Sequence, residues 1–254
     1  MKSRKSYSFV LLAAGLAFYL WSGSPQTAYA MHIMEGFLPP VWALFWWAVF
    51  IPFFLLGTRA LVRITRNTPE LKLMLGLAGA FTFVLSALKL PSVTGSSSHP
   101  TGTGLGAVMF GPLPMSVLGS VVLLFQAVLL AHGGITTLGA NAFSMAVAGP
   151  AAGYALYKLL SAATGRQGLA VFTAAAAANL TTYVVTSVQL ALAFPAESGG
   201  FLASLAKFGS IFAVTQVPLA ITEGLLTLLV WNWLKANSAE ELTLLNRLRG
   251  GKQA

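Results

Sequence analysis

Few side chains in this sequence could take part in chemistry, so the candidates are quickly found. The chain contains three histidines, no cysteine and no aspartate, and its six acidic residues are all glutamates. The lack of cysteine excludes disulfides, thiolate metal sites and cysteine nucleophiles, and the lack of aspartate excludes every mechanism that requires that residue. His32, His99 and His132 are therefore the first residues to consider as ligands or catalysts.

The first histidine is the second residue after a predicted cleavage site. A basic start precedes an apolar run over 9–20, and Ala28-Tyr29-Ala30 matches the small-x-small pattern at which signal peptides are cut. The apolar run is short against the roughly 20 residues of a spanning helix, which argues against an uncleaved anchor. We expect residues 1–30 to be removed, which would leave Met31 with a free α-amino group.

A free terminus at Met31 would make His32 part of a chelate. The α-amine, the amide nitrogen of the second residue and the imidazole of a histidine at that position can bind one cation through fused five- and six-membered rings. These nitrogens lie in one plane, and one more nitrogen would complete a square. Such a set favours Ni(II) or Cu(II) and suits low-spin Co(II), but it matches Mg, Ca or tetrahedral Zn poorly. The alternative is a histidine that is merely solvated near a chain end.

His99 lies in an uncharged segment of small residues, 92–104. Hydroxyls in this segment, such as those of Ser97, Ser98 and Thr101, can satisfy buried backbone groups or orient the imidazole. The alternative is a flexible exposed loop. The His-Pro step argues against it, because proline fixes its own φ and restrains the residue before it.

Three further groups have less specific patterns. His132 ends a helix, where hydrogen bonding to backbone carbonyls is favoured over a ligand role because cations are stabilised at helix C-termini. Glu35 could hold the amino terminus or the metal site by charge, or simply lie at the membrane interface. Glu223 falls inside the last apolar stretch, where an ionisable group is costly and by default functional. We expect it to be protonated and hydrogen-bonded, without a metal role, and its candidate partners are Gln126, Asn141, Asn179 and Gln189.

The composition indicates that a membrane domain positions these groups. Of the 254 residues, 56% are hydrophobic and only 8% are charged, against roughly 25% charged in an ordinary globular domain. A soluble enzyme is therefore excluded. The apolar stretches long enough to cross a membrane are 37–57, 71–90, 103–131, 135–160, 168–194 and 208–234.

The placement of basic residues sets the expected topology. The export signal puts Met31 outside, and the arginines between 59 and 66 then fall in a cytoplasmic loop, as the positive-inside rule requires. The later basic residues obey the rule only if 103–131 is broken at Gly111-Pro112-Leu113-Pro114. The half over 103–110 would then be a short helix buried among its neighbours.

The predicted fold class is an all-α membrane protein with about seven transmembrane helices, the N-terminus outside and the C-terminus cytoplasmic. Residues 31–236 form one transmembrane metal-binding domain, and 237–254 form a short polar cytoplasmic tail. The protein is expected to be a multi-pass component of the cell (inner or plasma) membrane.

Three segments together resemble a known family. They cover 31–39 (Met-His-Ile-Met-Glu-Gly-Phe-Leu-Pro), 85–104 with its Ser-Ser-Ser-His-Pro-Thr-Gly-Thr-Gly run, and 130–141. They are similar to the CbiM family, the substrate-specific (S) subunits of cobalt energy-coupling factor (ECF) transporters. The resemblance runs from the signal to the last helix. It implies an S-component-like bundle that captures Co²⁺ for import and cobalamin biosynthesis.

The resemblance also implies the ligands. The metal would be held by the mature amine of Met31, the amide nitrogen and imidazole of His32, and the imidazole of His99. Nickel-specific relatives more often begin Met-His-Ile-Pro-Asp-Gly, so Met34-Glu35 here favours cobalt, and an Ni²⁺-specific subunit of the same architecture is the alternative. Residues that could support the site without binding the metal are Glu35, Ser97, Ser98, Thr101 and His132.

The implied partners are a transmembrane coupling (T) protein, cytoplasmic ATPase subunits and a small auxiliary membrane subunit, with no nucleic acid. The sequence has no Gly-x-x-x-x-Gly-Lys-Ser/Thr phosphate loop, so ATP hydrolysis would come from other chains. Co²⁺ would be a transported substrate, and no catalytic cofactor is expected. A membrane metalloenzyme is a remote alternative that lacks its His-Glu-x-x-His motif. A structural scaffold is another, in which His32 and His99 would be freely replaceable.

Overall fold

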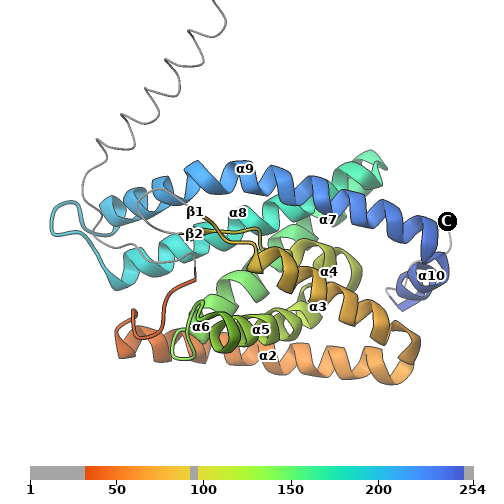
Figure 1. Cartoon of the computed structure of the whole chain (residues 1–254), viewed down its shortest axis with the longest axis horizontal. Helices are drawn as coiled ribbons and strands as arrows, with labels where there is room; N and C mark the ends of the chain where they lie inside the picture. The colour runs from red at the N-terminus through yellow and green to blue at the C-terminus, as the bar shows by residue number, and fades with distance from the viewer. Residues whose placement is uncertain (1–31, 92–96, 249–254) are drawn as a thin grey trace, which may run out of the picture.

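The computed structural model describes residues 32–91 and 97–248. The long helices run side by side in one bundle (Figure 1). The helical segments are α2 Pro40–Asn67, η1 Pro69–Leu71, α3 Lys72–Ala87, α4 Thr103–Phe110, α5 Pro112–Leu130, α6 Leu138–Ala142, the π-helical η3 Phe143–Ala148, α7 Gly149–Thr164, α8 Gln167–Ala193, α9 Gly200–Asn237 and α10 Ala239–Leu248. Two short strands, β1 Leu90–Pro91 and β2 Ser97–Ser98, pair antiparallel.

The predicted all-α membrane class is confirmed. Among the described residues, five helical stretches are long and apolar enough to cross a membrane: Pro40–Asn67, Pro69–Ala87, Pro112–Leu130, Gln167–Ala193 and Gly200–Asn237. The predicted stretch 135–160 corresponds to α6, η3 and α7, which follow one another without a break. This is a multi-pass integral membrane protein. The number of crossings, the orientation of the termini and the signal peptide stay predictions, and residues 1–30 lie outside the described part.

The predicted break in 103–131 is confirmed. Helix α4 ends at Phe110, and Gly111 takes φ 83° and ψ 175°, a conformation essentially restricted to glycine. Helix α5 then begins at Pro112, where the missing N–H removes no helical hydrogen bond. Every residue of α4 is buried. At Gly104, an added Cβ would lie 2.5 Å from the Cα of Ala175, so the absence of a side chain lets α4 pack directly on α8.

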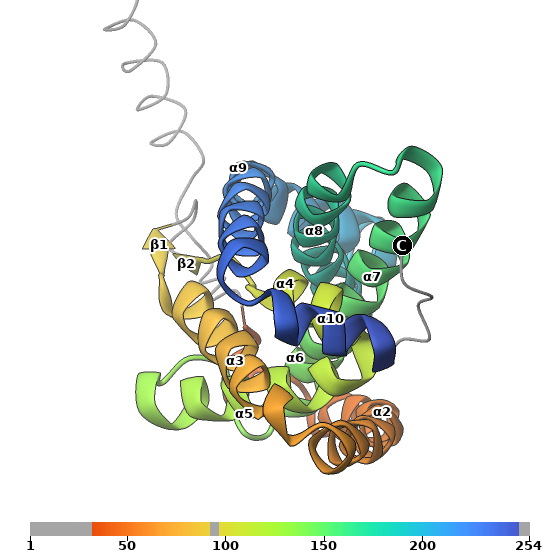
Figure 2. The same cartoon turned by 90° about the vertical axis from the view of Figure 1, so that its right-hand side faces the viewer.

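The two ends of the bundle carry different segments. One end holds the start of α2, the β1–β2 pair, the α5–α6 connection and the α8–α9 connection (Figure 1). The opposite end holds the α2–α3 turn, the α7–α8 turn and α10, which lies across the bundle when this end faces the viewer (Figure 2). Segments far apart in the sequence therefore meet at the first end, and all three histidines lie on these segments.

The tail predicted over 237–254 is more ordered than a polar extension. Residues Ala239–Leu248 form α10, an amphipathic helix. Leu245 is 4% exposed and belongs to the same core cluster as Leu71, Trp231 and Leu234. Leu242 packs against this cluster from one helical turn away, and the spacing of the two leucines explains why one face of α10 docks.

Candidate metal centre

The three histidines form one buried cluster. The ring centroid of His32 lies 4.7 Å from that of His99 and 4.6 Å from that of His132, and the other two are 5.1 Å apart. One ring nitrogen of each lies within 4.8 Å of the others. None of the three residues is more than 3% exposed. Among the described residues, no other group of three or more His, Cys, Asp or Glu comes together in this way.

Each of the three rings has one buried nitrogen without a hydrogen-bond partner. Nε2 of His32 lies 3.3 Å from Sδ of Met145, and Nδ1 of His99 lies 2.8 Å from the carbonyl oxygen of Pro100. Because a carbonyl only accepts, Nδ1 of His99 carries the proton and Nε2 keeps its lone pair. The buried unpartnered atoms are Nδ1 of His32, Nε2 of His99 and Nε2 of His132. Three such atoms in one cluster of rings are unusual in a folded protein and fit a bound cation.

Burial also sets the charge of the cluster. Desolvation is the largest cause that lowers the pKa of His32, His99 and His132 below the ordinary value of 6.5. The positive charge of Lys89 lowers all three further. At neutral pH the imidazoles are therefore uncharged, which is the form that binds a metal ion.

The segment that carries His32 is held by its main chain. The N–H of Ile33 donates to Oδ1 of Asn141 at 2.9 Å, and Nδ2 of Asn141 donates to the carbonyl of Ile33 at 3.0 Å. The hydroxyl of Thr137 donates to the same carbonyl at 2.6 Å. Helix α6 thus binds the residue after His32 on both sides. Sequence reasoning missed this role of Asn141, because the contact spans 108 residues.

The segment that carries His99 is held by three helices. The hydroxyl of Tyr183 on α8 donates to the carbonyl of His99 at 3.0 Å. The hydroxyl of Thr82 on α3 donates to the carbonyl of Gly102 at 3.0 Å. Gly102 has φ +70°, and a Cβ there would lie 2.8 Å from the Cα of Thr82, so only glycine fits this turn. In the described part of this segment, residues 98–104 are buried and held by these bonds, which rules out an exposed position for His99.

Glu223 on α9 is the third of these anchors. Its two oxygens accept from the N–H of Thr101 at 2.7 Å, the hydroxyl of Thr101 at 2.9 Å, the N–H of Gly102 at 2.8 Å and Nδ2 of Asn179 at 2.8 Å. Three of these four groups can only donate, so each of the two oxygens accepts at least one hydrogen bond. The predicted hydrogen bonding is confirmed, and the expected protonated form stays a prediction.

Of the four partners predicted for Glu223, only Asn179 is confirmed. The other three make different contacts: Gln126 donates to the hydroxyl of Ser86, Asn141 binds Ile33, and Gln189 donates to the carbonyl of Ala140.

The predicted supporting residues take several places. Thr101 joins the His99 loop to Glu223, and the hydroxyl of Ser98 donates to that of Thr215 on α9 at 2.7 Å. Glu35 is exposed, and hydrogen bonds from Thr136 in the α5–α6 connection lower the pKa of its carboxyl group. Ser97 lies in β2, and the role predicted for it stays a prediction.

His132 does more than end a helix, the role expected for it. Its main-chain N–H caps α5 by donating to the carbonyl of Gln126 at 3.1 Å, while its ring enters the cluster with Nε2 unpartnered. Met31, the predicted source of the terminal amine, lies outside the described residues.

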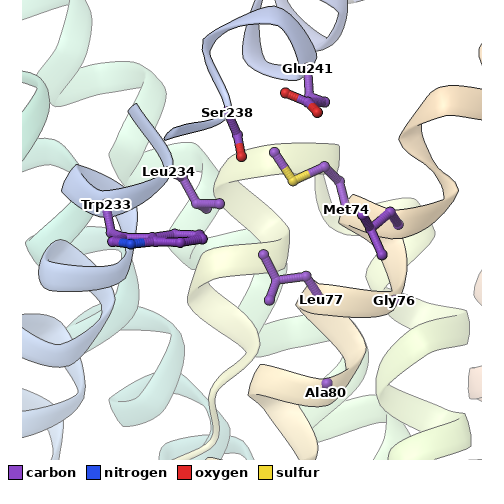
Figure 3. Close-up of a pocket in the computed structure, with 9 residues that line it drawn as sticks. Met74, Gly76, Leu77, Ala80, Trp233, Leu234, Ser238 and Glu241 are labelled. Atoms are coloured by element: carbon purple, nitrogen blue, oxygen red, sulfur yellow. The ribbon is translucent and has the colours of Figure 1, made fainter. Parts of the chain in front are cut away.

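A second hollow lies towards the opposite end of the bundle, between α3 and the α9–α10 corner, and has a volume of about 330 Å³. Leu77 and Met74 face Trp233 and Leu234 across it (Figure 3). Its one carboxylate, Glu241, stands without a histidine in the lining. This apolar hollow is therefore no competitor for the histidine cluster as a metal site.

Comparisons with known proteins agree with a membrane protein that transports a metal. Residues 32–241 match the CbiM family, described as "Cobalt uptake substrate-specific transmembrane region". Two proteins named cobalt transport protein CbiM are similar. The one from Nostoc sp. is 67% identical and covers 96% of this chain and 94% of its own length. The one from Anoxybacillus flavithermus is 60% identical and covers 96% and 97%.

A solved structure described as a truncated transition metal transporter superposes with a TM-score of 0.69 at 25% identity. It covers 81% of this chain and 99% of its own. A second solved structure, described as a transition metal transporter, also has a TM-score of 0.69 at 25% identity and covers 81% of this chain and 93% of its own. With the family match over most of the chain, these likenesses lead to one conclusion: this chain belongs to the CbiM family of cobalt-uptake, substrate-specific transmembrane proteins.

Proposed function

We propose that this chain is the substrate-capture (S) subunit of an ECF-type transporter that imports Co²⁺ for cobalamin biosynthesis. The ion is bound by the terminal amine of Met31, the amide nitrogen and Nδ1 of His32, and Nε2 of His99. The observation that carries the proposal is the set of buried ring nitrogens without hydrogen-bond partners at one end of the bundle. The relatives named as cobalt transport proteins support cobalt as the substrate.

The free nitrogen of His32 is the one that this chelate requires. A ring that closes through the amide nitrogen, Cα, Cβ and Cγ of the same residue reaches Nδ1 with six members, whereas Nε2 is too far away. In the structure Nε2 faces Met145 and Nδ1 is left unpartnered. The main-chain clamp on Ile33 holds the neighbouring peptide in place. His32 would thus be held in place before the ion arrives, which would reduce the cost of binding.

The chain does not need to hydrolyse ATP in this role. A coupling (T) protein, cytoplasmic ATPases and a small auxiliary membrane subunit would supply the energy and complete the transporter. The basic end of the bundle, with α10, would face the cytoplasm and the histidine cluster would face outside. Cobalt would thus be captured outside the membrane, in agreement with removal of a signal peptide after Ala30.

The test separates the terminal amine from the histidines. A Gly-Ser-Gly insertion between Ala30 and Met31 keeps all three histidines but moves the amine away from His32. We expect the purified variant, with its new terminus verified by mass spectrometry, to lose the bound cobalt that elemental analysis finds in the unmodified protein. The same insertion after Ser238, in the α9–α10 connection, is the control and should retain cobalt. Undiminished cobalt in the first variant would refute the chelate.

A further inference from the structure

The metal site has one imidazole more than a planar chelate can use. The amine of Met31, the two nitrogens of His32 and Nε2 of His99 complete a square. Nε2 of His132 is left over, although it is buried and unpartnered, and one ring nitrogen of His132 lies within 4.8 Å of a ring nitrogen of each of the other two histidines. We propose that His132 binds the ion from above the plane, as an apical fifth ligand, and that it makes the site prefer Co²⁺ to Ni²⁺. This inference rests on the proposed function.

The backbone around His132 explains why its ring is available. The cap of α5 is made by the main-chain N–H of His132, so the ring is not needed for it. Ala131 has φ +47°, the one positive φ at a non-glycine residue in the described part of the chain, and Gly133 has φ +78°. Such a conformation is unfavourable for alanine and is expected where function requires it. These two residues turn the chain so that the ring enters the cluster.

The distances allow all three rings to reach one ion. In this arrangement the three ring nitrogens are neighbouring ligands at right angles to one another, and two such ligands lie about 3.0 Å apart when each bond is about 2.1 Å long. One ring nitrogen of each histidine lies within 4.8 Å of the others, so closing on an ion needs each nitrogen to move by about 1 Å. The ring of His132 is tilted by 52° to that of His32 and by 70° to that of His99, so the rings approach from different directions.

The fifth ligand affects the two metals differently. In square-planar low-spin Ni(II), the d orbital that points above the plane is filled and repels an apical donor. In low-spin Co(II) the same orbital holds a single electron, and the ion accepts a fifth ligand to form a square pyramid. An apical imidazole therefore stabilises bound Co²⁺ more than bound Ni²⁺. Selectivity of this kind comes from geometry, because raw affinity in the divalent series favours nickel over cobalt.

Electron paramagnetic resonance of the cobalt-loaded protein, prepared without oxygen, tests the proposal. The unpaired electron of low-spin Co(II) points at the apical ligand, so one apical ¹⁴N splits each cobalt line into three. We expect this pattern in the unmodified protein, a change to two lines when histidine is labelled with ¹⁵N, and its loss in His132→Ala. The ratio of retained Co²⁺ to Ni²⁺ under competition should also fall, by about tenfold.

Two further variants keep this test decisive. His132→Phe keeps a ring at this position but has no nitrogen. It should lose the three-line pattern as His132→Ala does, because the loss comes from the missing nitrogen and not from a cavity. Ile135→Ala changes an exposed residue of the same connection and should keep the three-line pattern. Three-line splitting that persists in both His132 variants, or an unchanged metal ratio, would overturn the inference. Absence of stoichiometric cobalt in the unmodified protein would instead refute the proposed function.

Discussion

At the scale of single residues, the site depends on which atom of each polar side chain is already occupied. Nδ1 of His99 is hydrogen-bonded to the carbonyl of Pro100, and Nε2 of His32 lies against the thioether sulfur of Met145. These contacts select the tautomer and direct the free nitrogen of each ring to the cluster. Glu223 acts one step further away, because it fixes the two residues that follow Pro100. Glu223 is therefore a positioning residue for His99.

Replacement of Glu223 by glutamine tests this role. The new NH₂ group would face donors that now point at an oxygen of Glu223, so at least one buried N–H would lose its acceptor. We expect a 10- to 100-fold loss of cobalt affinity, the usual range when a group that supports a metal ligand is removed. Isothermal titration with Co²⁺ measures it. Glu197→Gln, at an exposed position, is the control. Equal affinities would show that the loop needs no clamp.

The low pKa values of the histidines predict a pH dependence of stability without metal. Burial lowers the pKa of all three below 6.5, so the unfolded chain binds more protons than the folded chain below that pH. The free energy of unfolding should therefore be insensitive to these groups above pH 7 and should fall as the pH drops from 6.5 towards 4. Thermal unfolding of metal-free protein in detergent measures it. His99→Ala should show a smaller fall, and an identical fall would exclude His99 as a contributor.

At the scale of elements, the site depends on short helices and close approaches. Helix α4 occupies only eight residues, because Gly111 and Pro112 end it and start α5. Its first residue, Thr103, directly follows the clamped turn at Gly102. The direct packing of Gly104 on Ala175 therefore sets how deep the His99 loop lies relative to α8.

Gly104→Ala should separate α4 from α8. The new Cβ would lie 2.5 Å from the backbone of Ala175, and neither helix can yield locally, so we expect destabilisation of about 1–3 kcal/mol together with weaker cobalt retention. The matched control is Gly79→Ala on α3, where nothing lies within 4 Å of the added carbon. Thermal unfolding and metal content of both variants decide the matter. Similar melting temperatures would mean that the α4–α8 contact can relax.

At the scale of the whole molecule, the two ends of the bundle have different tasks. The histidine cluster lies where the start of α2 meets the α5–α6 connection, and α10 covers the opposite end (Figure 2). The arginines of α2 lie near the α10 end. Their placement supports the proposed orientation, in which the metal site faces outside.

The absence of cysteine makes this orientation directly testable, since a single introduced cysteine would be the only thiol. Ser198→Cys, in the α8–α9 connection, and Ala163→Cys, at the end of α7, both lie at exposed positions. In intact cells an impermeant maleimide should label the first and not the second. Permeabilised cells should allow labelling of both, which is the control. The opposite pattern would invert the proposed topology.

The membrane class and the division of 103–131 followed from the sequence, because composition and the Gly-Pro-Leu-Pro break act locally. His32 and His99 followed from a short motif, supported by the family resemblance. The tertiary structure alone revealed the hydrogen bonds of Asn141 to Ile33, those of Glu223 to the His99 loop, and the ring of His132 inside the cluster. The contacts of Asn141 and Glu223 join segments up to about 120 residues apart. The position of the His132 ring depends on a backbone turn at Ala131. None of these features can be recognised in a short stretch of sequence, because hydrogen-bond partners and ring directions are set only when the helices pack.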